Sequence, residues 1–182
     1  MENIFQKNGR SCAAGTELLR WRISLPQCES KEGNIAAFYE EIGRRAVKYC
    51  EERLSALARS EFDALDDPDK RFSFSAFSYR LEGRVTYEDE QFWSLCLVAE
   101  LRRRGDRLPI AHFEDGQVWE KQSELRVPPE ELVRRLGAEA LGSRERKHAR
   151  GVLLSRDAVL WYDGESWHKK EISKEFARIL AE

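Results

Sequence analysis

Histidines are the first side chains of this sequence that could do chemistry, and there are three of them: His112, His148 and His168. A zinc site needs several histidine, cysteine or acidic ligands at close, regular spacing, and none of the three has such neighbours. We therefore predict no metal site. A catalytic histidine needs a positioned nucleophile or an orienting carboxylate, which spacing alone does not reveal.

Carboxylates are numerous, and Glu88-Asp89-Glu90, next to Phe92 and Trp93, is their densest cluster. Most of the others alternate with arginine and lysine, as on solvated helix faces. The sequence contains no Gly-x-Ser-x-Gly elbow and no glycine-rich phosphate loop. We therefore predict that the chain is not an enzyme, has no catalytic residues and binds no cofactor. A hydrolase using Glu88 or Glu90 is the alternative.

Cysteines occur at Cys12, Cys28, Cys50 and Cys96, with no Cys-x-x-Cys pair. Cys50 falls on the apolar face of a predicted helix and Cys96 lies within an apolar strand, so both are expected to be buried free thiols. Cys12 and Cys28 either stay reduced or pair in an oxidising compartment, and the sequence leaves both states open.

Two basic clusters could contact phosphates. One is Arg102–Arg104, and the other comprises Arg144, Arg146, Lys147, His148 and Arg150. The whole chain has 31 basic and 33 acidic residues, a formal charge of -2, so it has no general attraction to nucleic acid or an anionic membrane. We expect solvated turns and connectors, with weak nucleic-acid binding as a further alternative.

Hydrophobic periodicity predicts the elements that hold these side chains. Leu18 to Leu25 alternates like a strand, and Pro26 ends it. From Asn34, whose side chain can cap a helix, apolar residues recur at three- and four-residue steps to about Leu65. This stripe consists of Ile35, Phe38, Ile42, Ala46, Tyr49, Cys50, Leu54, Leu57 and Phe62.

Shorter strands follow the helix. The alternation of Phe72 to Tyr79 changes face near Ala76, which predicts a β-bulge. Further strands are expected at Phe92–Leu101, Leu108–Phe113, Val152–Leu154, Ala158–Tyr162 and from Trp167, with a turn at Arg102–Asp106 and hairpins at Asp115-Gly116 and Asp163-Gly164. A second helix should begin at Pro128 and a short last one at Ser173. The predicted class is α+β, a long N-terminal helix on an antiparallel meander with a C-terminal hairpin.

Aromatic residues around the second hairpin form the best binding candidate. Trp161, Tyr162 and Trp167 flank the Asp163-Gly164 turn, which must be exposed. These three are the predicted binding residues.

The domain organisation is predicted to be simple. With 182 residues, the chain can form one sizeable core over residues 17–182, preceded by a loose polar tail over residues 1–16. It has no stretch typical of a signal peptide or a membrane span, which predicts a cytoplasmic location for the chain as given. A piece of an exported protein would look the same.

Three segments carry a diffuse resemblance to a known family: Asn34–Glu51, His112–Val118 with Ser123–Leu125, and Gly151–Trp161. Over about residues 17–176 the chain resembles the RsiV-like domain of a lysozyme-sensing anti-sigma factor, which also precedes the catalytic domain of some polysaccharide deacetylases. The resemblance implies a strand, a helix and a meander, and a role in binding. The family often has a glycine- and histidine-rich turn where this chain has Arg102–Asp106.

The expected function is therefore a non-enzymatic interaction module of unassigned role. Its partner would be a protein or glycan, in a cell-envelope or regulatory context, and its oligomeric state is open.

Overall fold

The computed structural model describes residues 3–26, 28, 31–129, 131–132, 151–155, 158–163 and 165–171. Contacts divide the chain into two compact units. Unit 1 comprises residues 1–27, 36–83 and 98–114, and unit 2 comprises residues 28–35, 84–97 and 115–182. The single domain predicted for residues 17–182 stays a prediction.

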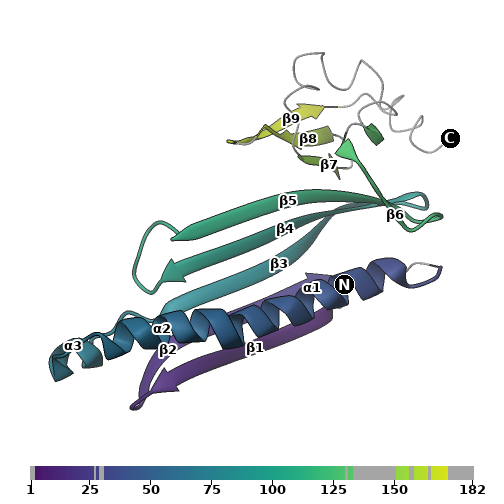
Figure 1. Cartoon of the computed structure of the whole chain (residues 1–182). Coiled ribbons are helices and arrows are strands. Elements are labelled where there is room, and N and C mark those ends of the chain that lie inside the picture. Colours follow the sequence, from purple (N-terminus) through teal and green to yellow (C-terminus); the bar gives the residue numbers. More distant parts are fainter. Residues whose placement is uncertain are drawn as a thin grey trace. The chain divides into compact units, whose positions relative to one another are not determined.

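The helices and strands follow one another in a mixed α+β order (Figure 1). Six strands pair in the order β1-β2-β3-β4-β5-β6, and three pair in the order β7-β8-β9. The elements are β1 (Asn3–Ala13), β2 (Thr16–Pro26), α1 (Asn34–Tyr49), a π-helical segment (Cys50–Leu54), α2 (Ser55–Asp63), α3 (Pro68–Phe72), β3 (Phe77–Glu88), β4 (Phe92–Arg103), β5 (Ala111–Glu120), β6 (Leu125–Val127), β7 (Gly151–Ser155), β8 (Ala158–Tyr162) and β9 (Trp167–Glu171).

Two parts of the predicted architecture are wrong. The long helix is not N-terminal, because β1 and β2 precede it. The six-stranded sheet is not purely antiparallel, because β2 and β3 run parallel, with Leu19 opposite Phe77 and Ser24 opposite Glu82. Parallel neighbours need a long crossover connection, and α1 to α2 supply it.

The predicted loose tail is also wrong over its described residues. Residues 3–13 form β1, which pairs antiparallel with β2 across a turn at Ala14 and Gly15. Both turn residues have positive φ angles, 48° and 81°, as a tight hairpin requires. The polar composition of β1 concealed it, because most of its side chains between Gln6 and Cys12 face solvent.

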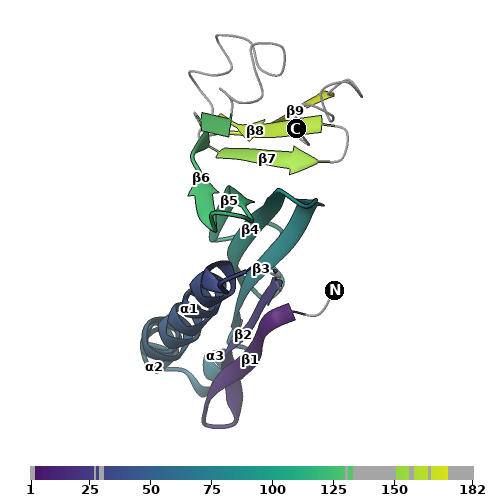
Figure 2. The same ribbon diagram turned by 90° about the vertical axis from the view of Figure 1, so that its right-hand side faces the viewer.

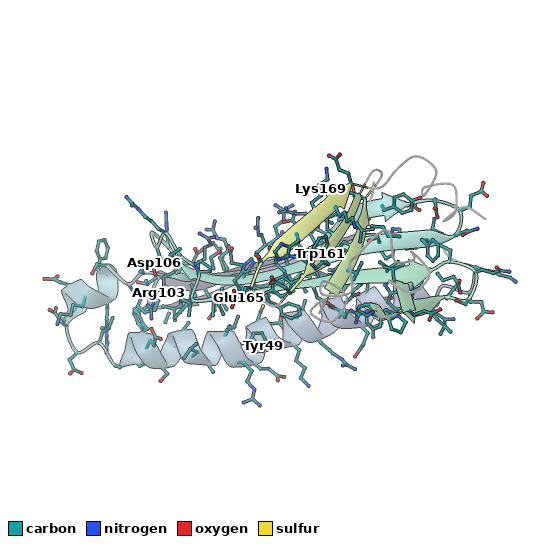
Figure 3. All side chains as sticks on the ribbon, turned by 90° about the horizontal axis from the view of Figure 1, so that it is seen from above. Tyr49, Arg103, Asp106, Trp161, Glu165 and Lys169 are labelled. Carbon is teal, nitrogen blue, oxygen red and sulfur yellow. The ribbon has the colours of Figure 1, made fainter. Side chains whose placement is uncertain are left out.

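The predicted long helix is confirmed, running without a break from Asn34 to Asp63. Its buried positions recur mainly at four-residue steps, which exceed the 3.6 residues of an α-helical turn. The π-helical segment takes up part of this difference, and there the amide and hydroxyl of Ser55 both donate to the carbonyl of Cys50. Cys50 is buried as predicted, whereas Tyr49 and Leu57 are about half exposed. Figure 3 shows Tyr49 on the long helix.

The N-terminus of α1 is held by a distant carboxylate, where we predicted capping by the Asn34 side chain. Glu124 accepts a hydrogen bond from the Asn34 amide at 2.7 Å and another from the Glu32 amide. The side-chain amide of Asn34 instead donates to Glu32. Glu124 is only 5% exposed and has a φ of 53°, so it occupies a strained backbone position to make these bonds.

The predicted β-bulge near Ala76 is absent, because the strand begins later than expected. Phe72 ends the short helix α3 and is almost fully exposed, and β3 starts at Phe77. The apolar positions of residues 72–79 change face along the sequence because this segment contains the end of a helix, a connector and the start of a strand. Phe74 in the connector packs its ring against Phe62 and Phe77.

Asp115-Gly116 does not form the predicted hairpin but lies within β5. A Cβ atom at Gly116 would come within 2.9 Å of Leu153 Cγ and Trp167 Cη2, and within 3.0 Å of the Val152 carbonyl oxygen. Glycine is needed here for close packing against another sheet rather than for a turn.

The C-terminal hairpin is part of a three-stranded antiparallel sheet, β7-β8-β9. The turn at Asp163 is confirmed, whereas most of the second helix and all of the last helix lie outside the described residues. One core of unit 2 joins this sheet to residues of β4, β5 and β6 and to Leu132; its members are Phe92, Val118, Val127, Leu132, Val152, Leu154, Val159 and Trp161.

Replacing Glu124 with alanine should lower the free energy of unfolding by about 1–3 kcal/mol, because two amides at the start of α1 lose their acceptor. Glu124→Gln, which keeps one oxygen acceptor, should lower it less. Chemical denaturation measures both changes. Glu90→Ala, at an exposed position, is the control and should stay within about 0.5 kcal/mol. An equal effect of Glu124→Ala and Glu90→Ala would refute this capping role.

Candidate anion-binding face

Within unit 1, the long helix covers one face of the sheet (Figure 1 and Figure 2). On that side Tyr79 packs against Tyr49, with ring centroids 6.1 Å apart, and Arg103 forms an ion pair with Glu61. The guanidinium carbon of Arg103 also lies 4.4 Å from the centroid of the Phe77 ring. Because side chains alternate along a strand, Ser78 and Arg80 of β3 and Glu100 and Arg102 of β4 point to the opposite side. We call this part of the sheet the open face.

Arginines gather on the open face. Across β2 and β3, Arg20 lies opposite Ser78 and Arg22 opposite Arg80. Across β1 and β2, Arg10 lies opposite Arg20. With two residues at the end of β4 they form a set that we call the arginine face: Arg10, Arg20, Arg22, Arg80, Arg102 and Arg104.

Like charges therefore stand side by side in two places, Arg10 with Arg20 and Arg22 with Arg80. Neighbouring strands are about 4.8 Å apart. Directly opposite like charges destabilise a sheet, on the order of a few tenths of a kcal/mol to 1 kcal/mol per pair. An anion bound between such arginines would remove this repulsion.

Carboxylates on the same face compensate only half of this charge. Arg10, Arg22 and Arg104 have no carboxylate within ion-pair distance in the described part of the chain. The other three arginines are paired: Arg20 with Glu17 at 2.9 Å, Arg80 with Glu82 at 3.5 Å and Arg102 with Glu100 at 2.8 Å. The chain as a whole is slightly acidic, so the positive charge on this face is a local concentration and not a property of the whole surface.

Glu100 shows the effect of this charge. The hydrogen bond from Arg102 lowers the pKa of Glu100, and the nearby charges of Arg80 and His112 lower it further, against the opposing effect of partial burial. Glu100 therefore stays ionised and fixes Arg102, but it is one carboxylate among several cations.

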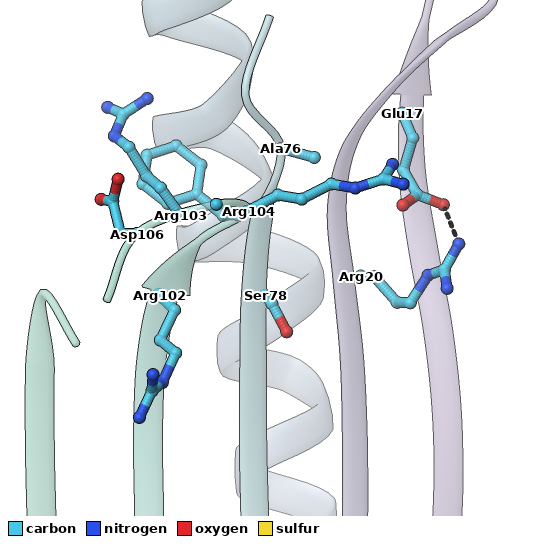
Figure 4. Close-up of a pocket in the computed structure, with 10 residues that line it drawn as sticks. Glu17, Arg20, Ala76, Ser78, Arg102, Arg103, Arg104 and Asp106 are labelled. Atoms are coloured by element: carbon cyan, nitrogen blue, oxygen red, sulfur yellow. Dashed lines mark hydrogen bonds and ion pairs between the residues drawn. The ribbon is translucent and has the colours of Figure 1, made fainter. Parts of the chain in front are cut away.

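Two hollows lie among these arginines. The first, of about 360 Å³, is lined by Glu17, Arg20, Ser78 and the segment Arg102–Asp106, and Figure 4 shows Arg104 extending across it toward Glu17. The second, of about 540 Å³, is lined by Asn8, Arg10, Arg20 and Arg22 with Gly9 and Trp21. Both are lined by Arg20, so the two hollows adjoin and can hold a ligand with more than one anionic group.

The predicted binding residues of the hairpin lie elsewhere, in unit 2. Trp161 is only 8% exposed, belongs to the core and stacks on His168 with ring centroids 5.2 Å apart. Tyr162 and Trp167 are half-buried, with ring centroids 5.4 Å apart. Trp161 therefore packs chiefly inside the protein, whereas Tyr162 and Trp167 keep part of their surface exposed.

His168 lies beside a serine and an aspartate without forming a catalytic triad. Asp163 Oδ2 is 2.6 Å and Ser166 Oγ 3.3 Å from His168 Nε2. A triad needs the two partners on different ring nitrogens, and here both meet the same one. Asp163 accepts hydrogen bonds from the Ser166 amide, from His168 and from the Glu165 amide. Together these bonds hold the pKa of Asp163 well below its usual range. These bonds shape the turn.

The acidic cluster Glu88-Asp89-Glu90 also shapes a turn. Asp89 accepts hydrogen bonds from the Tyr87 hydroxyl and from the amides of Gln91 and Phe92. Glu88 pairs with Lys121 at 2.7 Å. Two of the three carboxylates thus have structural partners, and the hydrolase alternative gains no support from this geometry.

Other chemistry foreseen from the sequence can be placed as well. All four cysteines are free thiols, Cys12 exposed and Cys96 half-buried. Burial, with a smaller contribution from Glu51, raises the pKa of Cys50 to about 12, so this thiol is inert at neutral pH. Among the described residues, no group of three or more histidines, cysteines and carboxylates is placed to hold a metal ion. The basic cluster of residues 144–150 lies outside them.

Residue types along the sequence do not predict most of the arginine face. Only Arg102–Arg104 stood out as a cluster, because the other arginines are distant in sequence and meet through strand register. The available signal is the alternation of Arg20 and Arg22 with apolar residues on one strand. Placing these arginines beside Arg10 also requires knowing that β1 is a strand and pairs with β2.

Comparison with solved structures supplies the fold relationship. A DUF3298 family member from Bacteroides fragilis NCTC 9343 superposes with a TM-score of 0.50 at 9% identity, covering 96% of this chain and 90% of that chain. The chain has the DUF3298 fold. DUF3298 proteins form the RsiV-like domain family, so the predicted resemblance is confirmed at the level of the fold. A DUF3298 protein from Pseudomonas aeruginosa PAO1 gives a TM-score of 0.48 at 11% identity, covering 96% and 91%. No family model and no curated protein matches the sequence.

No helix in the described part of this DUF3298-fold chain is long and apolar enough to cross a membrane.

Removing one arginine from a like-charge pair should stabilise the protein. We expect Arg22→Gln to raise the free energy of unfolding by up to about 1 kcal/mol at low ionic strength, and the gain to shrink in about 1 M salt, where charges are screened within about 3 Å. Chemical denaturation at both salt concentrations measures this effect. Arg53→Gln, on the exposed side of the helix, is the charge-matched control. Destabilisation by Arg22→Gln at low salt would contradict the repulsion.

Proposed function

We propose that this chain is a non-enzymatic interaction module that binds an anionic protein or glycan on the arginine face, in a cell-envelope or regulatory context. The observation that carries the proposal is the excess of guanidinium groups: Arg10, Arg22 and Arg104 lack carboxylate partners in the described residues and surround two adjoining hollows.

Guanidinium chemistry defines the ligand class. Each arginine presents a planar fork of donors that matches a carboxylate, phosphate or sulfate. An anion held between Arg22 and Arg80 gains these hydrogen bonds and also relieves the repulsion between the two side chains. Binding should therefore be strongest for ligands with several anionic groups, and it should weaken as salt screens the charges.

The same face favours a protein or glycan over single-stranded nucleic acid. Nucleic-acid-binding sheets stack bases on exposed aromatic rings. The aromatic residues that line the hollows, Trp21 and Phe77, are both buried and offer no ring face to a base. Weak nucleic-acid binding would rest on phosphate contacts alone.

Poly-glutamate and polygalacturonate are suitable probes, since they carry repeated carboxylates on a peptide and on a glycan. We expect at least one of them to bind the wild-type protein at low salt, and the double variant Arg22→Gln/Arg104→Gln to weaken that binding about tenfold, since charge-assisted bonds are lost. Isothermal titration calorimetry over a range of salt concentrations measures both effects.

The matched control is Arg45→Gln/Arg53→Gln, which removes the same charge from the exposed side of the helix. It should bind as the wild type does. The proposal fails if neither probe binds at low salt, or if both double variants weaken binding equally. Tighter binding of single-stranded DNA than of either probe would favour the nucleic-acid alternative.

The β8–β9 hairpin is the second candidate surface, because the rings of Tyr162 and Trp167 are partly exposed and adjacent. We expect Tyr162→Ala to abolish capture of an uncharged glycan on an array while leaving thermal stability within a few degrees. Trp161→Ala is unsuitable, because removing a buried tryptophan should cost about 3–5 kcal/mol and unfold the core. If no glycan distinguishes Tyr162→Ala from the wild type, this surface is not a glycan site.

A further inference from the structure

The turn that follows β4 presents apolar side chains beside the first arginine hollow. Leu108 is 78% exposed and Ile110 is 52% exposed. The preceding residues of the same turn, Arg104 to Asp106, line the hollow itself. Exposed aliphatic side chains next to a charged hollow mark a surface on which apolar and ionic contacts can be made together.

The backbone of this turn is fixed by several hydrogen bonds. The Ile110 amide donates to the Leu101 carbonyl at 2.7 Å, and the Asp106 amide donates to the Arg103 carbonyl at 3.2 Å. The guanidinium of Arg102 donates to the Arg107 carbonyl at 3.2 Å. The apolar side chains are thus held outward by a preorganised turn, which lowers the entropy lost when a partner binds.

We infer, resting on the proposed function, that the partner is a protein and that it offers an acidic segment carrying apolar side chains. A glycan could satisfy the arginines but would gain nothing from Leu108 and Ile110. Four residues separate Arg104 from Leu108, so at most about 14 Å of chain joins them. A short extended or helical segment, with carboxylates for the arginine face and an aliphatic side chain for the turn, reaches both.

Carboxylates at this end of unit 1 favour a discrete segment over an anionic membrane. Asp66, Asp67 and Asp69 lie at the start of α3, and Figure 1 shows α3 at the same end as the turn. Asp106 lies within the turn (Figure 3). A flat anionic bilayer resting on this hollow would meet Glu17 and Asp106, which line it, together with the arginines, whereas a narrow segment need contact only the arginines and the apolar side chains.

Two capped peptides test the inference, one of Glu-Glu-Leu repeats and one of Glu-Glu-Ser repeats. The leucine peptide should bind the wild-type protein at least about tenfold more tightly, the scale of burying one leucine side chain. Leu108→Ser/Ile110→Ser should abolish this preference while leaving the serine peptide's affinity unchanged. Fluorescence anisotropy with labelled peptides measures all four affinities, and circular dichroism verifies the fold.

The control double variant is Leu57→Ser/Leu125→Ser, which removes exposed leucines elsewhere and should keep the tenfold preference. Equal binding of both peptides to the wild type overturns the inference but leaves the proposed function standing. Binding of neither peptide at low salt, with no binding of poly-glutamate or polygalacturonate, overturns the proposed function as well. Equal peptide affinities together with Leu108-dependent binding to phosphatidylserine vesicles would replace the protein partner with a membrane.

Discussion

The parallel pairing of β2 with β3 is the constraint on which unit 1 depends. Because parallel neighbours need a crossover, the chain must pass through the long helix before it returns to the sheet. The crossover places that helix on one face, where Tyr49 meets Tyr79 and Glu61 meets Arg103. The strand register that results leaves Arg22 and Arg80 opposite each other on the open face. The helix packing and the charge pattern therefore have a common cause.

Local patterns in the sequence predict the local parts of this fold well. Helical periodicity locates the helix from Asn34 almost to its end, and the turns at Gly105 and Asp163 follow from residue types. The Asp115-Gly116 pair shows the limit of such rules. An aspartate followed by glycine is typical of a hairpin, but here glycine is required because Leu153 and Trp167 come too close for a side chain. Only the packing of distant segments decides between these two roles.

Non-local contacts explain why the binding surface was less predictable. The arginine face depends on the registers of β1 with β2 and of β2 with β3, and β1 has the composition of a polar tail. The acceptor for the first helical amides is Glu124, 90 residues away from Asn34, and no spacing rule connects the two. By contrast, the aromatic residues at 161, 162 and 167 were conspicuous in the sequence, and one of them serves largely to fill a core. Conspicuous residue types reflect packing as readily as recognition.

The position of β1 gives its charged residues a second consequence. β1 is the outermost strand of the six-stranded sheet, so among the described residues one row of its backbone groups has no neighbouring strand. Such edges promote aggregation unless charges or bulges interrupt them. Lys7 and Arg10 supply charge along this edge, and irregularities near Phe5 and Cys12 break its pairing pattern. Repulsion between Arg10 and Arg20 lowers the stability of the sheet, whereas the charge of Arg10 at the sheet edge opposes aggregation. The same side chain therefore decreases folding stability and increases solubility.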